Sequence, residues 1–342
     1  MSKRKTIEDV ARLAGVSKVT VSYVLNGRAA EARISDDTEV RVLAAARDLG
    51  YRPNALAKML LRQRTDSLAV AFQYATFFSA WSSFTSEVMR GVCDACVQAG
   101  MDLMLHTRGT EGSSADADTL TDGRVDGALI LRDADDPTLL ELIRRKFPCV
   151  LFFTRSTDTE VPFVDADNYA GGRMATQHLL KLGHRRIGMV RGSASSISSN
   201  DRFNGYRDAL EMAKMEVDPS LVLTLETPSA DPTAFMNLML SDDRPTALFV
   251  WSDDVAFALL RRLSELGLSV PDDVSIVGFD STEACERVSP ALTSVRQPIV
   301  EMAREATLLL VSLIRQEPVS RTQIIYPPSL DVRQSTAPPK AG

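Results

Sequence analysis

The sequence predicts two structural parts, a small all-α head at the N-terminus and a larger α/β body in which helices cover parallel sheets. Residues 6–27 contain two short segments of helical apolar spacing joined by a glycine, which predicts the head. Beyond residue 65, strand-like and helix-like segments alternate, as they do in parallel sheets flanked by helices. Charge changes at the same point, with 12 Lys/Arg against 7 Asp/Glu through Arg62 and 27 against 38 afterwards.

Composition is that of a soluble globular protein, with 44% hydrophobic and 25% charged residues in 342. No apolar run approaches the roughly 20 residues that a membrane helix needs. The basic N-terminus has no apolar stretch after it, so it does not read as a secretory signal. We therefore expect a cytoplasmic protein without a membrane partner.

A basic head on an acidic body also suggests binding to nucleic acid.

The cysteines are few and predict no disulfide framework. Cys93 and Cys96 form a C-x-x-C inside a segment that looks helical throughout. A redox pair normally opens a helix, and a structural zinc needs two further ligands nearby. Two ordinary helix cysteines are therefore favoured, and the scattered histidines suggest no metal cluster. No cofactor is expected. The remaining cysteines are Cys149 and Cys285, and the histidines are His106, His178 and His184.

The first helix of the head begins after Thr6, which forms a capping box with Asp9 in place of the favoured Glu or Gln. Gly15 ends the helix as a C-terminal cap. Its apolar set is Val10, Leu13 and Ala14.

The second helix begins at Ser17, an N-cap residue, runs to Leu25 and ends at Asn26-Gly27. Two short helices joined by such a turn form a DNA-binding helix-turn-helix, although a helical hairpin inside a larger α domain has the same spacing. The second helix turns polar or readable side chains away from its packing face. Lysine can donate to guanine, valine can touch a thymine methyl and short hydroxyls suit phosphates. These side chains are Ser17, Lys18, Val19, Thr20, Ser22 and Tyr23.

A third helix begins after Ser35, with acidic residues in its first turn, and stops at Gly50. Pro53 makes the segment 51–54 extended, and Asn54 can cap a short fourth helix over 55–61. The buried stripe expected for the third helix is Val40, Leu43, Ala44 and Leu49.

Residues 6–27 (TIEDVARLAGVSKVTVSYVLNG) and 51–60 (YRPNALAKML) closely resemble the head and hinge of the lactose-repressor (LacI) family. The resemblance implies a double-stranded DNA operator as partner. The implied base-reading positions are Lys18, Val19 and Tyr23, and the implied phosphate contacts are Ser17, Thr20, Ser22, Asn26 and Thr38. In the hinge, which includes Asn54, Leu60 matches a leucine that wedges into the minor groove; the alternative for Leu60 is packing against the core. The loop 26–34 looks longer than the family's, which leaves Arg28 and Arg33 undecided.

In the body, the alternation predicts strands and helices in turn. The expected strands are 68–74, 101–106, 125–131, 149–153, 186–190, 247–250 and 274–278, and the alternation resumes after 161–165. The expected helices are 81–99, 137–146, 168–182, 201–213, 232–240 and 253–266. The family resemblance continues through landmarks at 164–168, 182–187, 202–206, 277–280, 292–298 and 332–339.

This resemblance implies a two-lobed core similar to periplasmic sugar-binding proteins, with ligand between the lobes at the C-terminal ends of strands. The implied domains are a head over 1–53, a hinge over 54–64, and a core over 65–335 in which the chain crosses near Asp165, Thr293 and 323–327. The N lobe would hold about 65–163 and 294–323, and the C lobe about 164–293 and 324–335. The tail, 336–342, belongs to a C-terminal end from Ser335 that looks disordered.

Three residues match effector-contact or pocket positions of the family. Arg202 can donate charge-assisted bonds, with a surface ion pair as the alternative. Asp280 and Asp253 can accept from vicinal hydroxyls, although Asp253 could equally be a helix N-cap. Arg155, Phe78 and Trp81 are further candidates on the other lobe, where the two aromatic rings could equally fill the core.

The resulting hypothesis is a homodimeric repressor of a palindromic operator, switched allosterically by a small ligand, which is expected to be a carbohydrate. Whether ligand releases or tightens DNA stays open. A sugar-binding transport protein is disfavoured by the head and by the missing signal peptide. An enzyme on a doubly wound fold is disfavoured because no G-x-G-x-x-G, P-loop or nucleophile elbow follows a strand.

Overall fold

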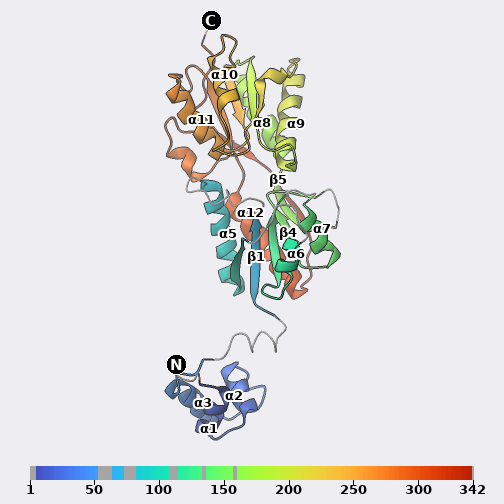
Figure 1. The fold of residues 1–342 in the computed structure, drawn as a ribbon, viewed down its shortest axis with the longest axis vertical. Coiled ribbons are helices and arrows are strands. Elements are labelled where there is room, and N and C mark those ends of the chain that lie inside the picture. The colour runs from blue at the N-terminus through green and yellow to red at the C-terminus, as the bar shows by residue number, and fades with distance from the viewer. Residues whose placement is uncertain are drawn as a thin grey trace. The chain divides into compact units, whose positions relative to one another are not determined.

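A computed structural model of the chain describes residues 5–52, 64–72, 82–107, 115–132, 136–156 and 160–340. The chain divides into two compact units, Met1–Thr65 and Asp66–Gly342, which are called the head and the core (Figure 1). Among the described residues, no helix has both the length and the apolar character needed to cross a membrane.

The head contains three helices within its described residues, and the caps predicted for them are confirmed. The side chain of Thr6 and that of Asp9 form a capping box, and Gly15 closes α1 with a left-handed φ of 65°. Ser17 and Ser35 each accept a hydrogen bond from the first turn of the helix that follows. The helices are α1 Ile7–Ala14, α2 Lys18–Leu25 and α3 Asp36–Asp48.

The buried face of α3 differs from the predicted one. The side chains of Val40 and Leu43 are exposed, at 65% and 38%, and so is that of Leu13 on α1, at 56%. Both the predicted and the observed sets on α3 follow helical spacing, so periodicity alone could not choose between them. Two of the three buried side chains on α3 are alanines, and their small size lets the helices of the head approach closely. The residues of α3 that are buried are Val42, Ala45 and Ala46.

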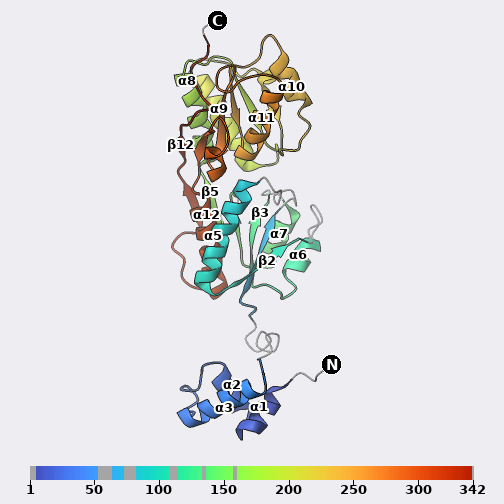
Figure 2. The same ribbon diagram turned by 90° about the vertical axis from the view of Figure 1, so that its left-hand side faces the viewer.

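The N lobe of the core is built on a six-stranded sheet with the order β11-β5-β4-β3-β1-β2. Alternate residues of β1 point to opposite faces, with Leu68 and Val70 toward α5 and α12, and Ala69 toward α6 and α7 (Figure 2). The strands are β1 Ser67–Phe72, β2 Asp102–His106, β3 Gly127–Leu131, β4 Cys149–Phe152, β5 Phe163–Ala166 and β11 Gln323–Tyr326. The helices are α5 Ser83–Ala99, α6 Ala115–Leu120, α7 Pro137–Arg144 and α12 Ile299–Arg315.

The C lobe repeats this plan with the sheet order β12-β10-β9-β8-β6-β7. Helices α8 and α9 cover one face, where Met189 and Phe249 are buried, and α10 and α11 cover the other, where Val190 and Leu248 are buried (Figure 2). The strands are β6 Ile187–Arg191, β7 Val222–Thr224, β8 Ala247–Val250, β9 Ser275–Asp280, β10 Thr293–Arg296 and β12 Ser329–Asp331. The helices are α8 Asn168–Lys181, α9 Ile197–Met212, η2 Pro219–Leu221, α10 Thr233–Leu240, α11 Asp253–Glu265 and η3 Glu283–Glu286.

The chain passes between the two sheets three times. It leaves the N lobe after β5, returns after β10 to form α12 and β11, and enters the C lobe again at β12. Periodicity predicted no counterpart of β5, α6, β7, β10, α12, β11 and β12. Helix α9 also begins four residues before its predicted start, because Ser196 caps it ahead of a serine-rich turn that reads as a loop.

The expectation that the chain is disordered from Ser335 onward is wrong for residues 335–340. The Ser335 hydroxyl is fully buried and donates to the carbonyl of Ile276 at 2.6 Å. The imidazole of His184, also buried, lies 2.9 Å from the carbonyl oxygen of Ala337 and 3.1 Å from the Ser275 hydroxyl. Lys340 pairs with Asp273 at 3.0 Å. These bonds hold the end of the chain on the C lobe.

Candidate functional site

Helix α2 presents two of its predicted base-reading residues to solvent. Val19 is 64% exposed, and Lys18 is exposed beside it. Val21 and Val24 are buried and fix the orientation of the helix. Lys18 forms an ion pair with Glu8 of α1, while Tyr23 is half-buried.

The predicted phosphate-contacting residues are held in place by bonds within the head. The hydroxyls of Ser17 and Thr20 are 2.9 Å apart, and Ser35 donates to Thr38 at 3.0 Å. The Asn26 amide donates to the carbonyl of Ser22 at 2.7 Å. These polar groups therefore start from defined positions, which lowers the entropic cost of meeting a phosphate.

The long loop 26–34 is anchored by Ala29, which is buried in the core of the head. This anchor places the guanidinium of Arg28 over the ring of Tyr23, 5.5 Å from its centroid, and Arg28 also pairs with Glu31 at 2.7 Å. Arg28 therefore lies beside a predicted base-reading residue, whereas Arg33 adopts a left-handed φ of 54° in the same loop. The hinge residues Asn54 and Leu60 and the aromatic candidates Phe78 and Trp81 lie outside the described residues.

In the C lobe, Arg202 lies on α9 and is 6% exposed, so it is not a surface ion pair. Its Nε donates to the Asn168 side chain at 2.8 Å and its Nη1 donates to the carbonyl of Trp251. Its guanidinium lies 3.5 Å from the centroid of the Phe279 ring. Burial lowers the pKa of Arg202, while the carboxylates around it act in the opposite direction. The arginine is thus held rigidly among the strand ends of the C lobe.

Asp280 closes β9 with a left-handed φ of 120° and is almost fully buried. The amide of Gln297 donates to it at 2.6 Å. Burial raises the pKa of Asp280 well above its usual range, and the charge of Arg202 partly offsets this effect. A buried carboxyl next to a fixed guanidinium is suited to recognising a polar ligand.

Asp253 is the first residue of α11, but Ser252 is its N-cap, so the N-cap alternative for Asp253 is wrong. Its carboxylate accepts from the Ser294 hydroxyl at 2.6 Å. It also accepts from the backbone N–H of Thr282 and from the Cys285 thiol, each at 3.0 Å. Burial raises the pKa of Asp253 to about 6. Since both oxygens already have donors, the residue fixes the loop after β9.

Arg155 follows β4 and connects the two lobes. Its guanidinium lies 2.5 Å from Asp201 of α9 and 3.5 Å from Asp165 of β5. The Ser198 hydroxyl donates to the carbonyl of Phe153 at 3.2 Å, next to this bridge. The structure therefore brings Arg155 to the same helix as Arg202, from the opposite lobe.

Two residues of this network were missed by sequence reasoning. Asp165 is buried and accepts from Asn168, and Trp251 follows β8, with its indole nitrogen donating to the carbonyl of Leu225 at 2.8 Å. Their positions in the sequence could have indicated them, because each lies at or just after the C-terminal end of a buried strand. Ligand-binding residues of parallel sheets are concentrated there. Ser199, in the first turn of α9, has a buried hydroxyl with no hydrogen-bond partner among the described residues.

Asp165→Asn is expected to flatten the pH dependence of stability. Burial raises the pKa of Asp165 to about 6 from an ordinary 3.8, so the folded protein binds this proton more tightly than the unfolded chain does. The resulting stabilisation is present below pH 4 and is lost as the pH rises toward 6, with a magnitude of about 3 kcal/mol at most. Urea unfolding between pH 4.5 and 7.5 measures it. The exposed control Asp242→Asn should keep the parental profile; a parental profile in Asp165→Asn would refute the assignment.

Cys93 and Cys96 both lie on α5 as free cysteines, and burial raises the pKa of Cys96 to about 11. In the described ranges no group of His, Cys, Asp or Glu could hold a metal ion.

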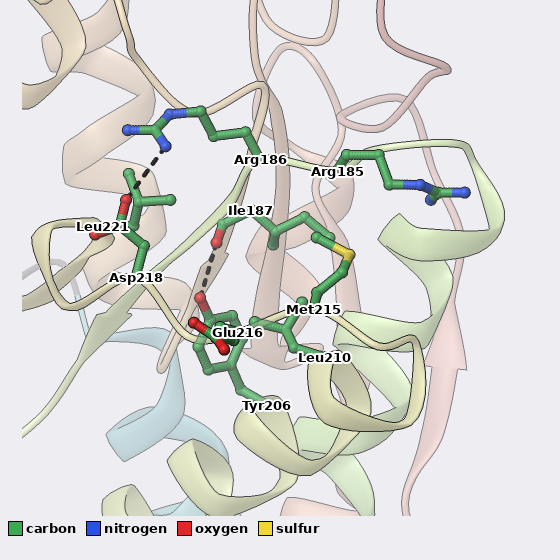
Figure 3. Close-up of a pocket in the computed structure, with 9 residues that line it drawn as sticks. All are labelled: Arg185, Arg186, Ile187, Tyr206, Leu210, Met215, Glu216, Asp218 and Leu221. Atoms are coloured by element: carbon green, nitrogen blue, oxygen red, sulfur yellow. Dashed lines mark hydrogen bonds and ion pairs between the residues drawn. The ribbon is translucent and has the colours of Figure 1, made fainter.

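A cavity of about 230 Å³ lies at the start of β6 (Figure 3). Asp280, in contrast, lies at the C-terminal end of its strand. Arg186 reaches toward Asp218, 3.2 Å away, and Tyr206 donates to the carbonyl of Ile187 at 2.8 Å. The predicted effector-binding residues that the structure describes, Arg155, Arg202, Asp253 and Asp280, do not line this cavity. It is therefore separate from the Arg202 network.

Both units contain segments that match models of known protein families. Residues 6–54 match the model described as bacterial regulatory proteins, lacI family, and residues 176–336 match a periplasmic binding protein-like domain. The chain is 35% identical to the transcriptional regulator CelR of Thermobifida fusca over 97% of this chain and 98% of that protein. It is 33% identical to the transcriptional repressor PurR of Photobacterium profundum over 96% of this chain and 98% of that protein.

Solved structures of similar proteins include a CelR–cellobiose complex, with a TM-score of 0.70, 34% identity and coverage of 97% of this chain and 100% of that one. The lac repressor dimer bound to operator and the anti-inducer ONPF gives a TM-score of 0.83 at 26% identity, with coverage of 98% and 100%. Head and core together define a DNA-binding regulator of transcription with a two-lobed ligand-binding core. The chain belongs to the LacI family of bacterial regulatory proteins.

Proposed function

We propose that this protein is a cytoplasmic repressor that binds a palindromic operator as a homodimer and is switched by a small carbohydrate. The proposal depends on the presence of two features in one chain. Helix α2 exposes Lys18 and Val19 to solvent, and the core contains a buried hydrogen-bond network around Arg202. A relative solved with cellobiose supports a sugar as effector. Similarity to transcriptional repressors named PurR keeps a purine as the alternative effector.

In this proposal Lys18, Val19 and Tyr23 read bases. Asn54 and Leu60 act in the minor groove. Arg202 and Asp280 contact the effector directly, together with Phe78, Trp81 and Arg155 from the N lobe. Asp253 supports the site by holding the loop after β9. The phosphate contacts are Ser17, Thr20, Ser22, Asn26 and Thr38.

The test is fluorescence anisotropy of a duplex from the gene's own upstream region, titrated with protein at several salt concentrations. Cellobiose, other sugars and purine bases are added in turn. Tight, salt-sensitive binding that one sugar shifts would support the proposal. A shift by a purine alone would replace the effector class. Binding no tighter than to random duplex, repeated on genome-selected DNA, would overturn it. Recovery of the effector unchanged after incubation separates a regulator from an enzyme.

Lys18→Ala is expected to weaken specific operator binding by about fivefold or more, because one base contact of this kind contributes about 1–3 kcal/mol. The matched control is Arg12→Ala, which removes the same charge from α1, where the side chain is exposed and paired with Asp9. The control should change operator affinity only slightly. Equal losses in the two variants would show that Lys18 contributes charge and no base recognition.

A further inference from the structure

Three residues that follow the core of β9, Asp280, Ser281 and Thr282, adopt an unusual backbone and are called the β9 turn. Asp280 and Ser281 have consecutive left-handed φ values of 120° and 50°. Neither is glycine, so this conformation costs free energy and persists only where surrounding contacts enforce it. All three residues are nearly or fully buried.

Each residue of the β9 turn is bonded to a different part of the C lobe. Asp280 accepts from Gln297 in the segment that leaves β10 for the N lobe, and the Ser281 hydroxyl donates to Asp331 of β12 at 2.5 Å. The Ser281 backbone N–H donates to the Ser294 hydroxyl at 3.1 Å. Thr282 donates its backbone N–H to Asp253. Because hydrogen bonds hold all three residues, we infer that a displacement of Asp280 also moves Ser281 and Thr282.

The far end of the β9 turn contacts α5 of the N lobe. The Ser83 hydroxyl donates to the Thr282 hydroxyl at 2.8 Å. The backbone N–H of Glu283 donates to the Glu87 carboxylate at 2.9 Å. Arg90 pairs with the Glu283 side chain at 3.2 Å, but both side chains are more than half exposed, so that pair contributes little. The hydroxyl pair is the directional, part-buried portion of the contact, and the Ser83 hydroxyl also lies 3.4 Å from the Asp254 carboxylate of α11.

We propose that the β9 turn couples the effector site of the C lobe to α5 of the N lobe, with Thr282 as the positioning residue. Asp280 lies at one end and the Ser83–Thr282 hydrogen bond at the other, on a backbone that is fixed along its length. A change at Asp280 is then transmitted to the first turns of α5. This inference rests on the proposed function only in giving Asp280 the role of an effector contact; the coupling is a property of the chain alone.

The test measures amide hydrogen exchange of the full-length protein without DNA or effector. Thr282→Val removes the hydroxyl at nearly constant volume and should speed exchange over residues 83–90 by about fivefold to tenfold, the loss expected for one hydrogen bond. Thr282→Ser keeps the hydroxyl and should restore the parental rate. Exchange in α10, which lies elsewhere in the C lobe, should not change in either variant. Unchanged exchange over 83–90 in Thr282→Val overturns the proposal.

The coupling itself is measured by adding Asp280→Asn to each background. Asp280→Asn should change exchange over residues 83–90 when residue 282 is Thr or Ser, and should add no further change when it is Val. Equal effects in all three backgrounds, or no effect in any, would show that Asp280 and α5 are independent. Operator and effector take no part, so this outcome stands apart from that of the anisotropy experiment. Circular dichroism of each variant confirms that it is folded.

Discussion

Arg202→Met is expected to abolish the response of operator binding to effector and to destabilise the core by about 3–5 kcal/mol, the usual effect of breaking a buried charge network. The methionine fills most of the volume but gives no bond to Asn168 or to the Trp251 carbonyl. It also removes the positive charge that partly offsets the burial of the Asp280 carboxyl, and it leaves the Asp165 carboxyl with Arg155 alone. Arg202→Lys keeps a charge but loses the planar group that stacks on Phe279, so it should rescue only part of either effect.

Denaturant unfolding and operator anisotropy with the sugar panel measure the two effects separately. The matched control is Arg207→Met on the same helix, whose side chain is 43% exposed and pairs with Asp208 and Glu211. Its stability should stay within about 0.5 kcal/mol of the parent. If Arg202→Met kept both its stability and its sugar response, Arg202 would be neither a ligand residue nor the centre of the network.

Gly172→Ala is expected to cost at least about 3 kcal/mol of stability, at the upper end of overpacking effects, and to disrupt the ligand site as well. A Cβ at Gly172 on α8 would overlap the carbonyl oxygen of Arg202 and lie 2.8 Å from its Cα. These are backbone atoms, so relief requires α8 and α9 to separate. Gly205 on α9 makes the reciprocal approach, where a Cβ would overlap the carbonyl oxygen of Tyr169. The two glycines let the helices approach closely and thereby place Arg202.

Thermal and urea unfolding of Gly172→Ala test this expectation, with Arg173→Ala as the neighbouring control on α8. Arg173 is half-buried and lies over the Tyr169 ring at 6.0 Å, so its removal should cost less than about 1 kcal/mol. A small loss for Gly172→Ala, equal to that of the control, would mean that the two helices tolerate separation. In that case the position of Arg202 would depend on its own hydrogen bonds.

Local chemistry explains which parts of the fold could be predicted. The caps at Thr6, Ser17 and Ser35 act within three or four residues, so the sequence alone specifies them. The buried strands of the core are equally local, as continuous apolar runs. The face of α3 was not predictable, because Val40 and Val42 begin two stripes of the same spacing, and only packing against the other helices chooses between them.

The candidate site divides in the same way. Arg202 and Asp280 were found by family resemblance, but their partners Asn168, Gln297 and the Trp251 carbonyl come from distant segments that no local pattern connects. Asp253 shows the same limit: its position at a helix start was visible, whereas its bonds to Ser294 and Cys285 depend on the tertiary fold. The ordered C-terminal residues were missed because a short polar, proline-rich end gives no periodic signal.

The three passages of the chain between the lobes bear on how the protein is synthesised. The N lobe needs α12 and β11, and the C lobe needs β12 and the buried Ser335. Neither lobe can therefore close its sheet until β11 and β12 have left the ribosome, whereas the first unit ends at Thr65. The nascent protein thus carries a finished head on an unfinished core. The apolar strands of the core stay unpaired until the later strands have been synthesised. The core, and not the head, is therefore the part that depends on protection from aggregation during translation.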